Sequence, residues 1–125
     1  MLHNPVTEAG SEGLVITKAA VNAAERLGLT ARILAGVIGV SEATVSRLKR
    51  RDVLLERGTK PFELAVLLVR LFRSLDAITG GDEPVARRWM TAENIVLGGR
   101  PVDRILSISG LIDVIAYLDA RRALV

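Results

Sequence analysis

Residues 31–51 contain two short amphipathic patterns separated by one glycine, and this arrangement constrains the fold more than any other feature of the sequence. The first pattern has apolar residues at the spacing of one helical face: Ile33, Leu34, Val37 and Ile38. Gly39 suits a helix end, because glycine adopts the left-handed backbone conformation without a steric penalty. Ser41 can then cap a second helix. The stretch therefore predicts two helices joined by a tight turn.

The second predicted helix has two unlike faces. Val45 and Leu48 share one face. Four residues at i, i+3, i+4, i+7 spacing share the other: Ala43, Ser46, Arg47 and Arg50. A helix that packs its apolar face against a neighbour and exposes small, hydroxyl and arginine side chains fits a DNA major groove. We therefore expect this face, including Ser46, to contact DNA.

Positive charge is concentrated beside this helix, although the net charge of the chain is only +3. Between residues 47 and 60 the acidic side chains are Asp52 and Glu56, and the basic side chains are Arg47, Lys49, Arg50, Arg51, Arg57 and Lys60. Such a patch is expected where a protein contacts DNA phosphates. The alternative is a solvated charged surface, since most charge runs are of that kind.

The composition argues against several classes of function. The chain has no cysteine and one histidine, His3, so disulfides, thiolate zinc sites and histidine-activated nucleophiles are not expected. The acidic residues do not cluster as metal ligands, and Gly98-Gly99-Arg100 lacks the spacing of a phosphate-binding loop. We therefore expect no enzymatic activity, no metal and no cofactor.

No segment of the sequence predicts a membrane span or an export signal. The longest apolar runs, such as residues 64–69, are far shorter than the roughly 20 residues that a membrane helix needs. The N-terminus is polar and carries Glu8 and Glu12 instead of a basic start and an apolar core. We expect no membrane association and a cytoplasmic location.

The remaining segments predict an all-α protein in three parts. Residues 1–13 show no sustained period and predict a flexible arm, followed by a helix from about Thr17 to Gly28. Residues 14–80 form the helix-turn-helix region, and Gly80-Gly81 marks the boundary to a small helical domain at 81–125. That domain is predicted to contain helices over residues 83–93, from Pro101, and from a cap at Ser109.

A long apolar helix from Pro61 to about Thr79 joins the two regions. Four leucines form one stripe along it: Leu64, Leu68, Leu71 and Leu75. This stripe predicts either a core helix that both halves contact or the interface of a homodimer that reads a palindromic site. The sequence leaves both alternatives open.

The first half resembles the Xre and phage-repressor type of helix-turn-helix. The matching residues are Leu34-Ala35, Gly39-Val40-Ser41 and Thr44-Val45-Ser46-Arg47-Leu48. The resemblance implies base contacts from Glu42, Ala43 and Arg47, and DNA-backbone contacts from Ser41, Thr44, Lys49 and Arg50. Ala31 stands where many relatives have a phosphate-binding glutamine, so DNA binding is expected to depend on dimerisation.

The second half resembles the C-terminal toxin-binding domain of MbcA/ParS/Xre antitoxins. The matching residues are Trp89-Met90, Asn94, Leu97-Gly98-Gly99, Pro101, Leu106, Gly110, Val114 and Leu118. The resemblance implies a homodimeric antitoxin that represses its own operon at a palindromic operator. It also implies that this domain covers the active-site cleft of a RES-domain toxin that acts on NAD or transfers ADP-ribose.

Candidate toxin contacts in this half are of two kinds. Trp89 is a large anchor, and Asn94, Gly98 and Pro101 are turn formers for which a structural role is the simpler interpretation. The arginines can contact the partner directly: Arg100, Arg104, Arg121 and Arg122. The alternatives are a stand-alone transcription regulator whose C-terminal half is a dimerisation or effector domain, and an adaptor with a vestigial helix-turn-helix.

Overall fold

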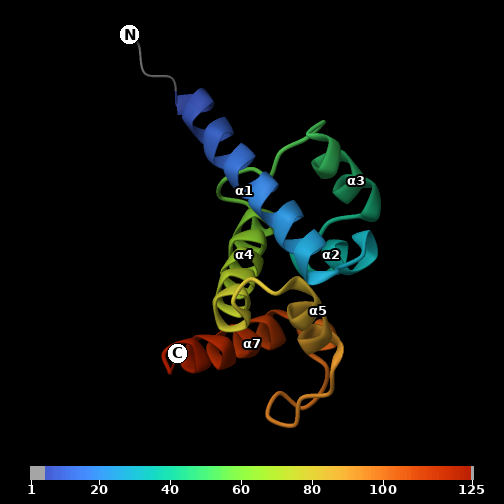
Figure 1. Ribbon diagram of the computed structural model, residues 1–125. Coiled ribbons are helices and arrows are strands. Elements are labelled where there is room, and N and C mark those ends of the chain that lie inside the picture. Colours follow the sequence, from blue (N-terminus) through green and yellow to red (C-terminus); the bar gives the residue numbers. More distant parts are fainter. Residues whose placement is uncertain (1–4, 125) are drawn as a thin grey trace.

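The computed structural model describes the backbone of residues 5–124 and the side chains of residues 11–124. In that part of the chain all regular secondary structure is helical, apart from one isolated bridge between Asn94 and Gly99, and loops connect the helices. The helices are α1 (Pro5–Leu27), α2 (Ala31–Ile38), α3 (Glu42–Arg50), α4 (Lys60–Thr79), α5 (Glu83–Thr91), α6 (Pro101–Arg104) and α7 (Ile108–Arg122) (Figure 1). The all-α prediction is confirmed.

Helix α4 is the centre of the core. It contacts α1, α2, α5 and α7, and Figure 1 shows α1 passing one end of it while α7 crosses the other. The leucine stripe faces inward, since all four side chains are buried within one protomer: Leu64, Leu68, Leu71 and Leu75. These leucines could meet a second copy only if the core opened. The dimer interface predicted on them is corrected accordingly, and the core-helix alternative describes them.

Helix α1 begins well before the predicted start near Thr17. Residues 5–13, expected in a flexible arm, are helical, and the loop after α3 packs closely against them. A Cβ atom on Gly13 would stand 2.4 Å from the carbonyl oxygen of Leu55, and the buried Thr17 hydroxyl accepts a 2.9 Å hydrogen bond from the Leu55 amide. Gly13 thus permits a close approach inside a helix. Residues 1–4, including His3, lie outside the described residues.

Hydroxyl and carboxylate caps set the starts of the later helices. Thr59 caps α4 by accepting from the Phe62 amide at 3.4 Å, and Asp82 caps α5. Helix α7 is capped by Ser107, which accepts from the Gly110 amide at 3.1 Å, and not by Ser109 as predicted. Ser107 has the extended backbone of a cap residue, whereas Ser109 already lies inside the first turn.

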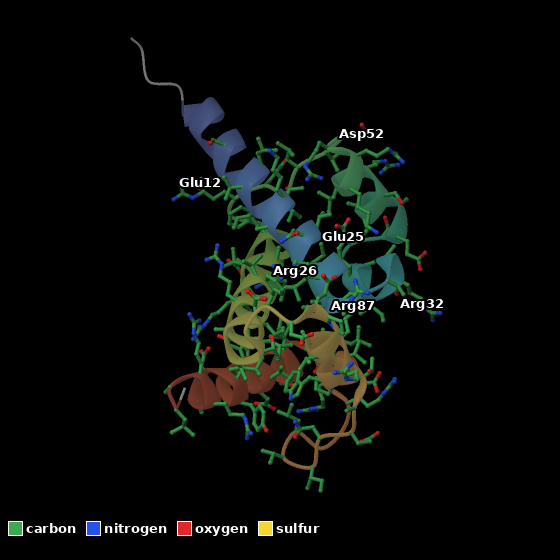
Figure 2. All side chains as sticks on the ribbon, in the orientation of Figure 1. Glu12, Glu25, Arg26, Arg32, Asp52 and Arg87 are labelled. Atoms are coloured by element: carbon green, nitrogen blue, oxygen red, sulfur yellow. The ribbon has the colours of Figure 1, made fainter. Side chains whose placement is uncertain are left out.

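Two arginines fix the end of α1 against the helices that follow. Arg26 pairs with Asp76 of α4 at 3.3 Å, and its guanidinium lies 4.9 Å from the centroid of the Phe72 ring. Arg87 of α5 donates to two carbonyls in the last turn of α1, those of Glu25 (2.8 Å) and Arg26 (3.3 Å). Figure 2 shows both arginines at this end of α1. Helices on both sides of Gly80-Gly81 are therefore packed together, and a domain boundary there remains a prediction.

No helix in residues 5–124 is long and apolar enough to cross a membrane.

Candidate nucleic-acid and partner interfaces

The α2–α3 pair has the geometry that the sequence predicts. Gly39 ends α2 with φ 74°, and its amide donates to the Ala35 carbonyl at 2.9 Å. Val45 and Leu48 of α3 are buried, so the opposite face of α3 is turned outward. Burial of two aliphatic side chains fixes the orientation of this face, because each contributes roughly 1.5–3 kcal/mol on leaving water.

Two of the predicted DNA contacts also stabilise the start of α3. The Ser41 hydroxyl accepts from the Thr44 amide at 3.1 Å and donates to the Thr44 hydroxyl at 3.0 Å. Thr44 is half-buried, whereas the other predicted DNA-contacting residues are exposed: Ser41, Glu42, Ala43, Ser46, Arg47, Lys49 and Arg50. The structure therefore brings the predicted residues together on one helix.

The positive patch is smaller than the sequence suggests. Arg50 pairs with Asp52 at 2.9 Å, and Arg51 folds back to donate to the Lys49 and Leu48 carbonyls. Arg57 and Lys60 also have acidic neighbours, Glu12 at 3.3 Å and Glu63 at 3.4 Å. Among the described side chains, no carboxylate lies within ion-pair distance of Arg47 or Lys49. Within this patch, the cations without a carboxylate partner among the described side chains therefore lie on α3, at Arg47 and Lys49, and directly after it, at Arg51.

Arg32 is a further basic residue near this surface that sequence reasoning missed. It is exposed near the start of α2, and Figure 2 shows it pointing away from the body of the protein. In helix-turn-helix proteins the first helix of the pair crosses the DNA backbone. Arg32 could have been recognised in the sequence from its position at the N-terminal end of the first predicted helix.

Residues 94–99 form a short hairpin between α5 and α6. The Asn94 amide donates to the Gly99 carbonyl and the Gly99 amide donates to the Asn94 carbonyl, both at 3.2 Å. The Asn94 side-chain oxygen also accepts from the Leu97 amide at 3.1 Å, and the Leu97 side chain is buried. Figure 1 shows this loop, in orange, projecting at the end of the molecule far from α3.

The tip of the hairpin consists of exposed apolar side chains. Ile95 is 98% exposed and Val96 is 75% exposed, while the hydrogen bonds around them hold the backbone in place. Adjacent exposed apolar side chains on an ordered element are a candidate interaction surface. Sequence reasoning missed both residues. The available signal was a pair of β-branched apolar residues inside a segment closed by Asn94 and Gly98-Gly99, too short to bury both.

Most of the predicted partner contacts in this half support the scaffold. Trp89 is half-buried and stacks on Tyr117 with ring centroids 6.1 Å apart. The Arg121 guanidinium lies over the Tyr117 ring, 5.2 Å from its centroid. Gly98 has a positive φ of 73° in the hairpin, and Pro101 is buried at the start of α6. These residues are divided between the hairpin, the start of α6 and the contact between α5 and α7.

The four predicted arginine contacts differ in their availability. Arg100 binds the Asp103 carboxylate through two hydrogen bonds of 2.8 and 3.1 Å, and this partner raises the pKa of Arg100. Arg104 pairs with Asp113 at 2.9 Å. Arg121 and Arg122 are exposed at the end of α7. The last two are therefore the more accessible cations of this half.

Gly110, a position of the C-terminal pattern, has a steric reason to be glycine. A Cβ atom there would stand 1.8 Å from the Arg104 carbonyl oxygen, so only glycine lets α7 start directly against the end of α6. No group of three or more potential metal ligands occurs among the residues with described positions.

Each half of the chain matches a known protein family. Residues 10–70 match the antitoxin Xre-like helix-turn-helix domain, and residues 74–123 match the antitoxin Xre/MbcA/ParS C-terminal toxin-binding domain. None of the curated proteins compared matches the chain. The two families follow one another in the order that the sequence motifs predict and together cover the helices from the middle of α1 to the end of α7. The chain belongs to the Xre/MbcA/ParS type of antitoxin, with a helix-turn-helix followed by a toxin-binding domain.

Proposed function

We propose that this antitoxin binds and blocks the active-site cleft of a RES-domain toxin that consumes NAD or transfers ADP-ribose, and that it represses its own operon. The observation that carries the toxin half is the hairpin: Ile95 and Val96 are exposed apolar side chains on an ordered loop of the toxin-binding domain. A partner that buries such side chains gains about 1.5–3 kcal/mol for each of them. The protein acts in this proposal by binding, as a regulator and not as an enzyme.

The cationic end of α7 gives the toxin surface a second component. Arg121 and Arg122 are exposed there, and guanidinium groups pair with carboxylates on a partner surface. Electrostatic complementarity of this type speeds association and selects the partner. We propose the hairpin tip as the anchor and these arginines as the contacts that orient the toxin.

The DNA half of the proposal rests on α3. Arg47 and Lys49 are exposed and lack neighbouring carboxylates among the described side chains, while Val45 and Leu48 hold the helix in place. Arg47 can donate two hydrogen bonds to a guanine edge in the major groove. Lys49 and Arg50 can contact phosphates without regard to sequence. A homodimer would present two such helices to a palindromic operator in the protein's own promoter.

A co-expression experiment with the toxin gene from the same operon tests the proposal. We expect the toxin alone to stop growth and to deplete NAD or modify a target with ADP-ribose, and the full chain to restore growth. A footprint of the purified chain on the operon promoter tests repression. If the chain binds the promoter but does not restore growth, it is a stand-alone regulator, and the toxin half of the proposal is overturned. If it restores growth but does not bind the promoter, it is an adaptor, and the DNA half is overturned.

A further inference from the structure

Helices α1 and α4 together form an apolar face that is exposed among the described residues, with Arg122 of α7 at one edge. Val15 of α1 is 61% exposed and Val66 of α4 is 39% exposed. Two surface hollows, of about 330 and 460 Å³, adjoin here and share the residues Val15, Ile16 and Val66 in their walls. Glu12 also lines this face, and Figure 2 shows it on the side of α1 away from α3. The face is thus separate from the DNA-contacting helix.

The two ends of this face carry opposite charge. The smaller hollow is bordered by Ser11 and by Glu12, which also pairs with Arg57 at 3.3 Å. The larger one is bordered by Arg73 and Arg122, and by Arg70, which pairs with Asp119. A surface with an acidic end and a basic end is complementary to itself after a rotation of 180°. Such a rotation is the two-fold operation of a homodimer, in which the same patch of both subunits forms the interface.

The exposed residues of α1 have the same antisymmetric pattern about Val15. Glu12 lies three positions before Val15 and Lys18 three positions after it, and both are exposed. The small residues Ser11 and Ala19 lie four positions before and after. In an antiparallel helix pair centred on Val15, residues at equal distances on opposite sides of Val15 face each other. Glu12 would then face Lys18 of the partner subunit twice, and the small residues would allow the helices to approach.

We infer that this face, with Val15 on the two-fold axis, is the homodimer interface and is occupied by a second copy of the chain. The inference rests on the homodimer of the proposed function and replaces the leucine stripe, which is buried inside the protomer. Neither α3 nor the hairpin at residues 94–99 lines the face, so both remain accessible in the dimer.

A cysteine crosslink tests the position of the axis. The chain has no cysteine, so Val15→Cys introduces the only thiol. We expect oxidation of this variant to give a disulfide-linked dimer in high yield. The matched control is Val85→Cys on α5, which is 37% exposed and lies outside the face, and which should stay uncrosslinked. Equal crosslinking of the two variants would overturn the inference.

Light scattering of the full chain tests the interface itself. We expect a dimer for the wild type and for Val85→Asp, and a monomer with unchanged helical circular dichroism for Val15→Asp at the same concentration. A dimeric Val15→Asp variant overturns the inference. If that dimer has also lost toxin binding, the face is a toxin-binding surface instead of the dimer interface. A monomeric wild type overturns it too.

Charge exchange tests the antiparallel register. Lys18→Glu and Glu12→Lys should each weaken the dimer by about two- to tenfold, because each change affects two symmetric surface pairs, and the double exchange should restore it. Arg57→Ala controls for the contact that Glu12 makes within its own subunit and should leave the dimer unchanged. Failure of the double exchange to restore the dimer overturns this register.

The same variants separate this inference from the proposed function. A Val15→Asp monomer that still neutralises the toxin leaves the toxin half of the proposal intact. A chain that is dimeric through this face but never neutralises a toxin contradicts the proposed function and not the dimer interface.

Discussion

Helix α3 and the hairpin at residues 94–99 present their side chains by opposite means. Buried Val45 and Leu48 hold α3, and its outward face is polar and basic. Main-chain hydrogen bonds between Asn94 and Gly99 hold the hairpin, and its tip is apolar. On α3 the apolar residues supply the support and the polar residues are exposed, whereas in the hairpin polar groups supply the support and the apolar residues are exposed.

This difference predicts how each surface responds to solution conditions. Contacts from Arg47 and Lys49 to DNA release counterions and weaken as salt rises. Contacts from Ile95 and Val96 lose exposed apolar area on binding and depend little on salt. Salt should therefore separate the two activities of one chain, with promoter binding lost at a salt concentration that leaves toxin binding intact.

The largest effect is expected at the hairpin tip. The double substitution Ile95→Asp with Val96→Asp should weaken toxin binding by at least about 100-fold, because each lost apolar anchor costs about 2 kcal/mol, or about 30-fold. Isothermal titration against the toxin measures this change. Promoter binding should be unchanged, and Val85→Asp, which adds a charge to another exposed valine of the same half, should bind the toxin normally. Normal toxin binding by the double variant would remove the hairpin from the interface.

The next largest effect is expected at Arg47. Arg47→Ala should remove about 1–3 kcal/mol of discrimination at one base position, which is about 5- to 150-fold in relative affinity. A sequence-preference profile of the operator measures it, and toxin binding serves as the internal control. A profile that stays the same at every position would show that Arg47 reads no base.

A smaller effect is expected for the phosphate contacts. Lys49→Ala should lower the slope of log affinity against log salt by about 1. Arg50→Ala should lower it less, because Arg50 is already paired with Asp52 at 2.9 Å. Affinity titrations at several salt concentrations compare the two variants. Equal slopes for wild type and Lys49→Ala would place Lys49 outside the DNA interface.

The smallest effect concerns the scaffold on which the toxin-binding half depends. A hydrogen bond from the Ser74 hydroxyl, at 2.8 Å, lowers the pKa of Asp119 on α7, and Arg70 lowers it further. Because the folded pKa lies below the unfolded value, this group stabilises the α4–α7 contact above its unfolded pKa. That contribution is lost as pH falls through the folded pKa.

Ser74→Ala should therefore raise the Asp119 pKa, as carboxyl chemical shifts in an NMR titration would report. On acidification, amide exchange should increase in α7 before it increases in α3. A simultaneous increase in both helices would show that α3 and α7 unfold together as a single unit.

Much of the fold follows from patterns in the sequence. The two faces of α3, the glycine at the end of α2 and the proline near the start of α4 each have a local physical cause, so they could be predicted residue by residue. The start of α1 could not be predicted in this way. Gly13 argues locally against a helix, and the reason for a glycine there is the close approach of Leu55 from a loop that is distant in the sequence. The role of the leucine stripe could not be predicted either. Periodicity shows which face of a helix is buried, but it does not show whether the same chain or a second copy buries that face.

The candidate surfaces show the same limit. The candidate residues of α3 could be named from the sequence because one helix carries both the motif and the exposed face. In the second half the recognisable residues, such as Asn94 and Gly110, are those that shape the backbone. Ile95 and Val96 have no constrained role within the fold, so no family motif includes them, and their only signal was that the short segment could not bury both. A motif therefore located the hairpin without locating the side chains that it presents.

The two family matches meet inside α4, between residues 70 and 74, and this helix supplies core residues to both halves. A recombination event that joined a new partner-binding module at this point would have to keep one helix compatible with two cores. We expect exchange of modules among such antitoxins to bring changes on both sides of α4 together. The specificity for DNA and the specificity for toxin then evolve on one chain under a shared structural constraint.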